Sequence, residues 1–419
     1  MDFKSAAFQA LAGVSTPLRL TWDTVPSWGT SDFGLYLHVP FCRVLCPFCP
    51  YNRVRYSAEL YTLFESAVYR ELDHYLPILA GRRINSFYIG GGTPTVDPGG
   101  LVRLIAHIKA VFPGEYPTAV ELSPAASDTH VLSELRKVGV GQVSIGVQSL
   151  FDGELRKIGR NHDAVAAQEA LRNCLQAGFT VNADLMFALP NQNDDSWCRT
   201  LDDVLQIGVH EISTYPMFSF SYTKQNPKSF SKSGRAPEKV LRRRLEIARH
   251  AAEREGFVRS TVWSWTRPEA VPFSSVTRHR YIGLGPGAAS MTGSSFYINT
   301  FSILDYAGAV ASRLPIALTM HVPPRLSRIY WLYWSFYALA VSRGEFTAKF
   351  GGMNLDREFG VFLGVMRRLG WLSEDTEGYR VTNAGAYWIH RLQNAYSLRY
   401  LERLWSACLY EPWPKEVCL

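Results

Sequence analysis

The sequence predicts an α/β fold in which a partial (β/α)6 barrel is followed by a smaller, mainly helical C-terminal domain. From about residue 34, short apolar runs alternate with longer amphipathic segments, a pattern typical of parallel strands connected by helices. After residue 256 this alternation ends, and most of residues 323–419 has the spacing of helices. Because 47% of the 419 residues are apolar and 19% are charged, the chain can bury a large core, which excludes a disordered protein.

The alternating part of the chain predicts six strands, each followed by a helix. The strands are expected at residues 34–39, 86–90, 118–122, 142–147, 180–187 and 210–215. The helices are expected at residues 57–79, 99–112, 129–138, 164–177, 195–207 and 238–255. In sheets of this kind the chemistry collects at the carboxyl ends of the strands, so we expect the functional residues there.

We expect three parts along the chain: an N-terminal extension over residues 1–33, the barrel over 34–290 and the C-terminal domain over 291–419. Within the last part, residues 371–382 have the pattern of a β-hairpin. The aromatic stretch at residues 330–337 has two interpretations. It predicts either a helix in the core of this domain, which is the commoner use of such a stretch, or a cover for a flat, lipophilic substrate.

Charge and hydropathy exclude several classes of protein. The net charge of +7 is modest, and the densest basic stretch, residues 239–254, has the spacing of an amphipathic helix and predicts no nucleic-acid partner. The longest apolar run, residues 329–341, is shorter than the roughly 17–25 residues that span a membrane, so no transmembrane segment is expected. The N-terminus lacks the pattern of a signal peptide, which predicts a cytoplasmic, reducing location.

Three of the seven cysteines, Cys42, Cys46 and Cys49, lie together directly after the first predicted strand. Thiolates in this C-x3-C-x2-C spacing can converge on one soft metal centre. An iron–sulfur cube held by three cysteines leaves one iron open for a ligand. The alternatives are three free cysteines, or a zinc site completed by a distant residue, because the next three residues supply no fourth ligand. The other cysteines are expected to be dispensable: Cys174, Cys198, Cys408 and Cys418.

The segment Tyr36-x-His38-x-Pro-Phe-Cys42, together with the cysteine spacing, resembles the cluster loop of the radical S-adenosylmethionine (SAM) superfamily. It is most similar to the branch of oxygen-independent coproporphyrinogen III dehydrogenase and the heme chaperones. The resemblance implies a 4Fe-4S cluster on Cys42, Cys46 and Cys49 and SAM bound at its open iron. It also implies that one electron, from a reduced flavodoxin- or ferredoxin-type donor, cleaves SAM to a 5′-deoxyadenosyl radical.

Loops at the other predicted strand ends also resemble this family, in the segments GGGTPT, VELSP, SIGVQS, IGRNH and NADLMFALP. The resemblance implies SAM contacts at Tyr36, Phe48, Gly91, Gly92, Thr93, Glu121, Gln148, Arg160 and Asp184. Glycines let the backbone approach a ligand closely and offer N–H groups to a carboxylate. Two alternatives remain. Glu121, in a segment where Ser123 replaces the usual Asn, could form a surface salt bridge, and Gln148, Arg160 and Asp184 could form a purely structural polar network.

Three functions are compatible with this resemblance. The first is a class C methyltransferase or methylene transferase that uses two SAM molecules and acts on an aromatic or unsaturated small molecule, such as a quinone, a heterocycle or a polyene. The second is a coproporphyrinogen dehydrogenase or a heme-opening enzyme. The third is a non-catalytic heme chaperone. Heme chaperones commonly have a His near the position of Ala289, and the absence of a His from segment 281–290 counts against this function.

Three observations favour the first function. Only about 33 residues precede the first strand, whereas the dehydrogenases have a longer N-terminal segment. Tyr51 stands where they commonly have a further cysteine. The aromatic stretch at residues 330–337 could cover a flat substrate. The sequence identifies no catalytic acid or base.

Overall fold

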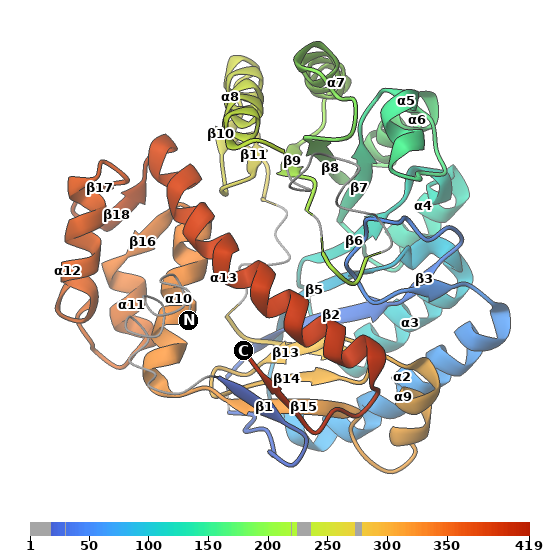
Figure 1. The fold of residues 1–419 in the computed structure, drawn as a ribbon. Coiled ribbons are helices and arrows are strands. Elements are labelled where there is room, and N and C mark those ends of the chain that lie inside the picture. The colour runs from blue at the N-terminus through green and yellow to red at the C-terminus, as the bar shows by residue number, and fades with distance from the viewer. Residues whose placement is uncertain (1–17, 30, 219, 224–235, 273–278) are drawn as a thin grey trace.

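The computed structural model describes residues 18–29, 31–218, 220–223, 236–272 and 279–419 (Figure 1). Most of the expected N-terminal extension, residues 1–17, and Thr30 lie outside the described residues. No helix in the part of the chain that the structure describes is long and apolar enough to cross a membrane.

The predicted parallel sheet is confirmed. Its six strands lie within two residues of the expected positions: β2 (Phe33–Val39), β5 (Ile84–Gly91), β6 (Thr118–Leu122), β7 (Gln142–Gln148), β8 (Thr180–Phe187) and β9 (Glu211–Pro216). They follow one another in the sheet in chain order, and every neighbouring pair is parallel. All six carboxyl ends therefore meet at one edge, where the candidate site residues were expected.

The predicted helices lie on the outer side of this sheet (Figure 1). They are α2 (Ala58–Leu79), α3 (Pro98–Val111), α4 (Thr129–Lys137), α6 (Ala164–Gln176), α7 (Asp194–Ile207) and α8 (Glu238–Arg254). A short helix that was not predicted, α5 (Asp152–Lys157), follows β7. Five of the six predicted helices begin at a side chain that accepts a hydrogen bond from a first-turn N–H, which fixes their starts in the local sequence: Ser57, Asp97, Asp128, Asp163 and Asn193.

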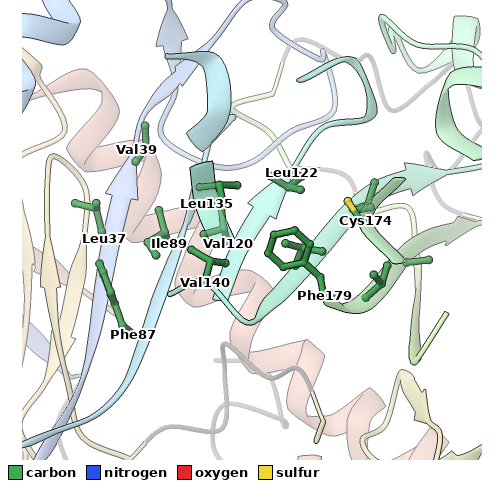
Figure 2. Packing of buried hydrophobic residues seen from close by; sticks show 14 of the residues in the cluster. Leu37, Val39, Phe87, Ile89, Val120, Leu122, Leu135, Val140, Cys174 and Phe179 are labelled. Atoms are coloured by element: carbon green, nitrogen blue, oxygen red, sulfur yellow. The ribbon is translucent and has the colours of Figure 1, made fainter. Parts of the chain in front are cut away.

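Side chains alternate between the two faces of the parallel sheet. On the outer face, Leu37, Ile89 and Val120 are fully buried and pack with the helices in one large core (Figure 2). On the inner face, the intervening positions hold Tyr36 and Tyr88, which form a small separate cluster. This two-residue period means that a single strand both builds the core and projects functional groups into the barrel.

The sheet continues beyond the predicted barrel and has 14 strands among the described residues. Strand β12 (Tyr281–Leu284) lies parallel to β2, and an antiparallel part follows with β13 (Ala289–Met291), β14 (Ser295–Asn299), β15 (Ile316–His321), β1 (Arg19–Thr21) and β19 (Glu416–Cys418). At the other end, β11 (Ser264–Thr266) and β10 (Val258–Arg259) follow β9. Strands β13 and β14 pair across the expected boundary at residue 290, and that boundary remains a prediction.

The C-terminal part is mainly helical, as predicted. Its helices are α9 (Ile303–Ala309), α10 (Pro324–Tyr337), α11 (Arg343–Lys349), α12 (Leu355–Arg368) and α13 (Asn383–Tyr410). The expected hairpin forms from β17 (Leu372–Glu374) and β18 (Gly378–Val381), with β16 (Ala340–Ser342) added beside it. Helix α13 runs diagonally across the molecule from this small sheet toward β14 and β15 (Figure 1), where its Tyr400 contacts Phe296 of β14.

The aromatic stretch lies in α10 and belongs to the protein core. Trp331 and Phe336 are buried in the hydrophobic cluster of the C-terminal part. Tyr330 packs with the cluster around β13–β15, and Tyr337 packs against the main core. The core interpretation therefore describes this helix, which joins three hydrophobic clusters with one run of aromatic side chains.

Candidate functional site

The three neighbouring cysteines lie on a loop whose two ends are paired. The loop runs from β3 (Phe41–Cys42) to β4 (Val54–Arg55), and these two short strands lie side by side. The N–H of Tyr56 donates to the Cys42 carbonyl at 3.0 Å, which closes the base of the loop. All three thiols are free of disulfides. Pairing at the base holds Cys42, Cys46 and Cys49 on one compact turn of chain.

Arg53 ties this cysteine loop together, a role that the sequence analysis did not identify. Its guanidinium donates to the Cys46 carbonyl at 2.5 Å and to the Tyr51 carbonyl at 3.1 Å, so it bridges the chain on either side of Cys49. The Nε atom of Arg53 is buried and has no hydrogen-bond partner among the described residues. The only signal in the sequence is a cation directly after a cysteine motif.

Hydrogen-bond donors also point at the sulfur atoms. The Thr93 hydroxyl donates to Cys42 Sγ and the Arg160 guanidinium to Cys46 Sγ, both at 3.6 Å. Burial raises the pKa of Cys49 to about 11, and the positive charge of Arg53 opposes this shift. Donors and cations around buried sulfur suit thiolates that carry negative charge in a metal centre.

A zinc ion would need a fourth protein ligand beside the three cysteines. A zinc site needs four ligand atoms within about 2.3 Å of one point. Among the residues that the structure describes, no three side chains of His, Cys, Asp or Glu converge in that way. That Cys42, Cys46 and Cys49 hold an iron–sulfur cluster with one open iron stays a prediction.

The glycine run after β5 packs tightly between the cysteine loop and an inner-face acid. A Cβ atom on Gly92 would lie 2.5 Å from the Phe41 carbonyl oxygen, and one on Gly90 would lie 2.7 Å from the carboxyl carbon of Glu121. Gly91 has a φ of +114°, which an L-residue rarely adopts. Glycine is therefore required here for close packing.

The expectation that this glycine run offers free N–H groups to a ligand is wrong. The N–H of Gly91 donates to Glu121 at 3.1 Å, and the N–H groups of Gly92 and Thr93 donate to the carbonyls of Val39 and Phe41. These bonds extend the ladder between β2 and β5 into the loop. That Gly91, Gly92 and Thr93 contact SAM stays a prediction, and any polar contact would have to use groups other than these three N–H groups.

Glu121 projects from the inner face of β6 and is not in a surface salt bridge. One carboxyl oxygen accepts from the Tyr88 hydroxyl at 2.6 Å and the other from the Gly91 N–H. Burial raises the pKa of Glu121, while these two hydrogen bonds oppose the shift. Each carboxylate oxygen has a second lone pair, so Glu121 can still accept from an ammonium or hydroxyl group.

Asp184 lies two strands away on the inner face of β8. It accepts from the Ser144 hydroxyl at 2.8 Å and from the Asn182 amide at 3.0 Å. Burial raises the pKa of Asp184 to about 7, and the negative charge of Glu121 adds to the shift. A carboxyl group held in this state takes up a proton easily at neutral pH.

Gln148 and Arg160 lie at the carboxyl end of β7, between these two acids. Gln148 has a φ of +67° and accepts from the Tyr215 hydroxyl at 3.3 Å. Arg160 donates to the Gly146 carbonyl at 2.7 Å as well as to Cys46. The structure therefore brings together the predicted group of Gln148, Arg160 and Asp184, and each of them also has a partner within the protein.

Tyr36 and His38 connect β2 to the end of the cysteine loop. His38 Nε2 lies 2.8 Å from the Asn52 carbonyl and its Nδ1 lies 2.7 Å from the Tyr36 hydroxyl. Burial lowers the pKa of His38 to about 4, so the ring is neutral. Because a carbonyl only accepts, Nε2 carries the proton and Nδ1 accepts from Tyr36. Asn52 in turn donates to the Pro286 carbonyl of the glycine-rich segment 281–290.

The inner face of the barrel strands is acidic. Its carboxyl groups are those of Glu121, Asp184 and Glu211, and no inner-face position of β2 or β5–β9, all of which are described, holds a Lys or Arg. Phe48 packs against the small hydrophobic cluster of Ile158, Met186 and Leu189 beside these strand ends. Tyr51 leaves 53% of its surface exposed. The strand ends are aromatic and acidic, whereas the cysteine loop and the chain after α5 are basic, with Arg43, Arg53, Arg55 and Arg160.

Comparisons with known proteins point to the family that the cysteine motif resembles. The family model of the radical SAM superfamily matches residues 36–204. The heme chaperone HemW of Mycobacterium tuberculosis is 28% identical over 305 residues, which cover 68% of this chain and 76% of the relative. The oxygen-independent coproporphyrinogen III oxidase of Escherichia coli is 31% identical over 201 residues, covering 46% of this chain and 43% of that protein.

One solved structure is similar over nearly the whole chain. The coproporphyrinogen III oxidase (HemN) of Escherichia coli, described as a radical SAM enzyme, has a TM-score of 0.76 at 19% sequence identity. The match covers 94% of this chain and 98% of that protein. At this identity the likeness concerns the fold, and it confirms the predicted barrel with its helical C-terminal part.

Proposed function

We propose that this chain, a radical SAM enzyme of the branch that includes HemN and HemW, transfers a methyl or methylene group to an aromatic or unsaturated acceptor. The acceptor would be a small, uncharged molecule such as a quinone, a heterocycle or a polyene. The reaction would use two SAM molecules, one as the radical source and one as the carbon donor.

The residues described above fit the two cofactors. Cys42, Cys46 and Cys49 would hold the 4Fe-4S cluster, and the donors on Thr93 and Arg160 would stabilise charge on its sulfur ligands. When bound, the cluster and SAM supply the one-electron cleavage that gives a 5′-deoxyadenosyl radical. The proposed SAM contacts lie around the strand ends: Tyr36, Phe48, Gly91, Gly92, Thr93, Glu121, Gln148, Arg160 and Asp184.

The acidic inner face is the observation that carries the choice of acceptor. Coproporphyrinogen is a polycarboxylate, and its binding would need several cations close to the radical. The barrel strands present Glu121 and Asp184 there, and Arg160 is committed to Gly146 and Cys46. Like charges in a partly buried site repel strongly, so this wall favours a neutral, flat acceptor.

Two other functions have support of their own. One relative, at 31% identity, is a coproporphyrinogen III oxidase, and this similarity favours oxidation of a tetrapyrrole. A heme chaperone is similar over a longer part of the chain. Against a chaperone role, His38, the one histidine on an inner-face position of the described strands, uses both ring nitrogens in hydrogen bonds.

A labelling experiment tests the proposal. The reconstituted protein is reduced under anaerobic conditions and incubated with methyl-labelled SAM and, separately, a quinone, a heteroaromatic compound, a polyene and coproporphyrinogen III. Label in one of the first three products, with 5′-deoxyadenosine formed, supports carbon transfer. Decarboxylated coproporphyrinogen without label in any product would establish the oxidase instead.

A heme titration separates the remaining alternative. The proposal expects weak, non-stoichiometric heme binding and SAM cleavage that does not depend on heme. Tight binding of one heme per chain, together with no SAM cleavage by the reduced protein, would identify a chaperone. The Cys46→Ala variant serves as the control without a cluster in both experiments.

A further inference from the structure

We propose that a basic groove between α5 and α7 docks an acidic one-electron carrier protein, which delivers the electron that the cluster requires. The inference rests on the proposed radical function, because only an enzyme that cleaves SAM reductively needs this partner. The proposed docking surface lies outside the barrel, beyond the carboxyl ends of β7 and β8.

The groove has a volume of about 790 Å³ and cations on both of its walls. Arg156 and Lys157 come from the last turn of α5, and Arg199 comes from α7. All three side chains are exposed, and none forms an ion pair with a described residue. Two acids also line the groove. Glu154 is buried and bonded within the protein, so only Asp195 adds an exposed negative charge.

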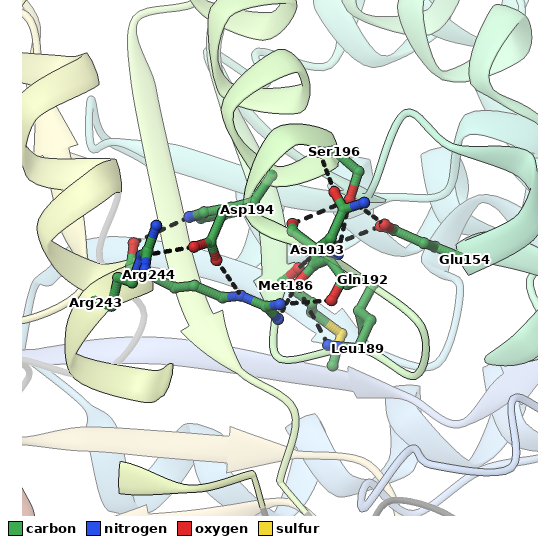
Figure 3. A network of polar contacts seen from close by, with 10 residues as sticks. Glu154, Met186, Leu189, Gln192, Asn193, Asp194, Ser196, Arg243 and Arg244 are labelled. Carbon is green, nitrogen blue, oxygen red and sulfur yellow. Dashed lines mark hydrogen bonds and ion pairs between the residues drawn. The ribbon is translucent and has the colours of Figure 1, made fainter. Parts of the chain in front are cut away.

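Buried hydrogen bonds hold the two walls of this groove at a fixed separation (Figure 3). Glu154 of α5 is buried and accepts from the Ser196 hydroxyl of α7 at 2.5 Å and from the Ser149 hydroxyl at 2.7 Å. Gln192 donates to Glu154 at 3.2 Å and accepts from Arg244 of α8 at 2.9 Å. The groove is therefore preformed, which lowers the conformational cost of docking a partner.

The three cations of the groove keep their positive charge unpaired among the described residues. On the other side of α7, two exposed cations of α8 are instead paired with acids of α7. Arg243 pairs with Asp194 at 2.6 Å and Arg254 pairs with Asp202 at 2.7 Å. Cations that keep no partner within the chain produce a positive field that attracts an acidic protein.

The groove adjoins the cysteine loop. A Cβ atom on Gly159, which follows α5, would lie 2.7 Å from Pro47 of that loop, and Arg160 donates to Cys46 Sγ. Arg160 is the third residue after Lys157, so their Cα atoms lie within about 11 Å even along an extended chain. A carrier seated in the groove would therefore lie close to the proposed cluster.

The chemistry of docking and transfer is simple. Acidic side chains of the carrier would contact Arg156, Lys157 and Arg199, and electrostatic attraction would raise the association rate at low salt. In the transfer itself one electron leaves the reduced carrier and enters the cluster. The carrier is oxidised by one electron, the cluster is reduced by one, and no bond or proton is exchanged.

A charge-reversal variant tests the groove. The holoenzyme with Arg156→Glu, Lys157→Glu and Arg199→Glu is compared with the unchanged protein in 5′-deoxyadenosine formation, driven either by a reduced acidic flavodoxin or by dithionite. With flavodoxin at low salt, kcat/KM for the carrier should fall about tenfold or more. With dithionite, the rate should not change. The unchanged protein should also lose rate as salt rises, and the variant should not.

A matched control keeps the same change in net charge. Arg70, Lys239 and Arg325 are exposed, lie on α2, α8 and α10, and form no ion pair with a described residue. Reversing these three should leave the flavodoxin-driven rate within about twofold, since exposed charges beyond a Debye length are screened. Equal losses of the flavodoxin-driven rate in both variants would overturn the proposal. An unchanged carrier-driven rate when millimolar phosphate occupies the groove would also overturn it. Absence of SAM cleavage with dithionite in the unchanged protein would instead refute the proposed function.

Discussion

The two faces of the parallel sheet are made from alternate residues of the same strands, but they follow different rules. On the outer face, Leu37 and Phe87 have no exposed surface and belong to the large hydrophobic core. On the inner face, Tyr36, Glu121 and Asp184 are polar and only half-buried at the strand ends. Helices close the outer face, whereas the inner face keeps open surface for ligands.

The two faces contribute differently to the stability of the fold. Covering the outer face stabilises the fold by about 25 cal/mol for each Å² of apolar surface removed from water. The inner face instead places two carboxyl groups, Glu121 and Asp184, where burial raises their pKa values. Groups with raised pKa values are common in functional sites and are poor contributors to stability.

The largest predicted effect compares one residue type on the two sides. Cys46→Ala should abolish the brown cluster chromophore and SAM cleavage, because the cluster has only three protein ligands. Cys174 is fully buried in the outer core, so Cys174→Ala should lower the free energy of unfolding by about 1 kcal/mol and leave the iron content unchanged. Iron analysis and chemical denaturation measure both. Full iron content in Cys46→Ala would contradict the ligand assignment.

A smaller effect is expected when the stabilities of variants at two neighbouring residues of β2 are compared. Leu37→Ala should lower the free energy of unfolding by about 3 kcal/mol, because it leaves a cavity in the outer core. Tyr36→Phe should change it by about 1 kcal/mol or less, since only the hydrogen bond to His38 is lost, but it should weaken SAM binding. Urea denaturation and SAM titration measure the two quantities. A larger loss of stability in Tyr36→Phe than in Leu37→Ala would contradict the distinction between faces.

The next prediction concerns a buried acid that lies among the outer helices. Glu71 of α2 is fully buried and accepts from the Gly285 N–H, the Asn299 amide and the Tyr306 hydroxyl. Glu71→Gln should lower the free energy of unfolding by about 1–2 kcal/mol, because one of these donors loses its acceptor. Tyr306→Phe, which removes a single donor, is the matched control and should cost less. Unchanged stability in Glu71→Gln would show that this network relaxes freely.

The smallest effect is a dependence of stability on pH. Asp184 has a folded-state pKa of about 7, above its ordinary value of 3.8, so the native state binds more protons than the unfolded chain between these values. Its contribution to stability is present at low pH and is lost as pH rises through about 7. Asp184→Asn should therefore flatten the decrease in urea midpoint of the cluster-free protein between pH 5 and pH 8. Glu71, whose pKa is also raised to about 7 by burial, should keep part of the slope.

Local patterns were sufficient for most of the barrel. The strands of β2 and β5–β9 were found because an apolar run bounded by amphipathic segments is a local signal, and helix starts such as Asp97 and Asp163 carry their own capping groups. Helix α5 and strand β12 were missed because six and four residues are too short for a periodic pattern. The pairing of Arg19 with Cys418, which brings two strands from distant parts of the chain together at one edge of the sheet, has no local signal at all.

The candidate site was predictable to the same degree. Motif spacing identified Cys42, Cys46 and Cys49, and parallel strand order implied that Glu121 and Asp184 would lie at one edge. The clamp formed by Arg53 and the internal hydrogen bonds of the glycine run could not be read, because backbone partners are chosen by three-dimensional contact. The basic groove was invisible for the same reason, since Lys157 and Arg199 are far apart along the chain.

The sequence by itself determined the order of strands and helices, the cysteine loop and the set of residues that face the site. These follow from periods of two and 3.6 residues and from fixed spacings, which act over short stretches of chain. Only the tertiary structure decided which of these groups remain available to a ligand, how the glycine-rich segment holds Asn52, and where unpaired cations gather. Those outcomes depend on hydrogen-bond partners and charges that long-range folding brings together, and no local pattern encodes them.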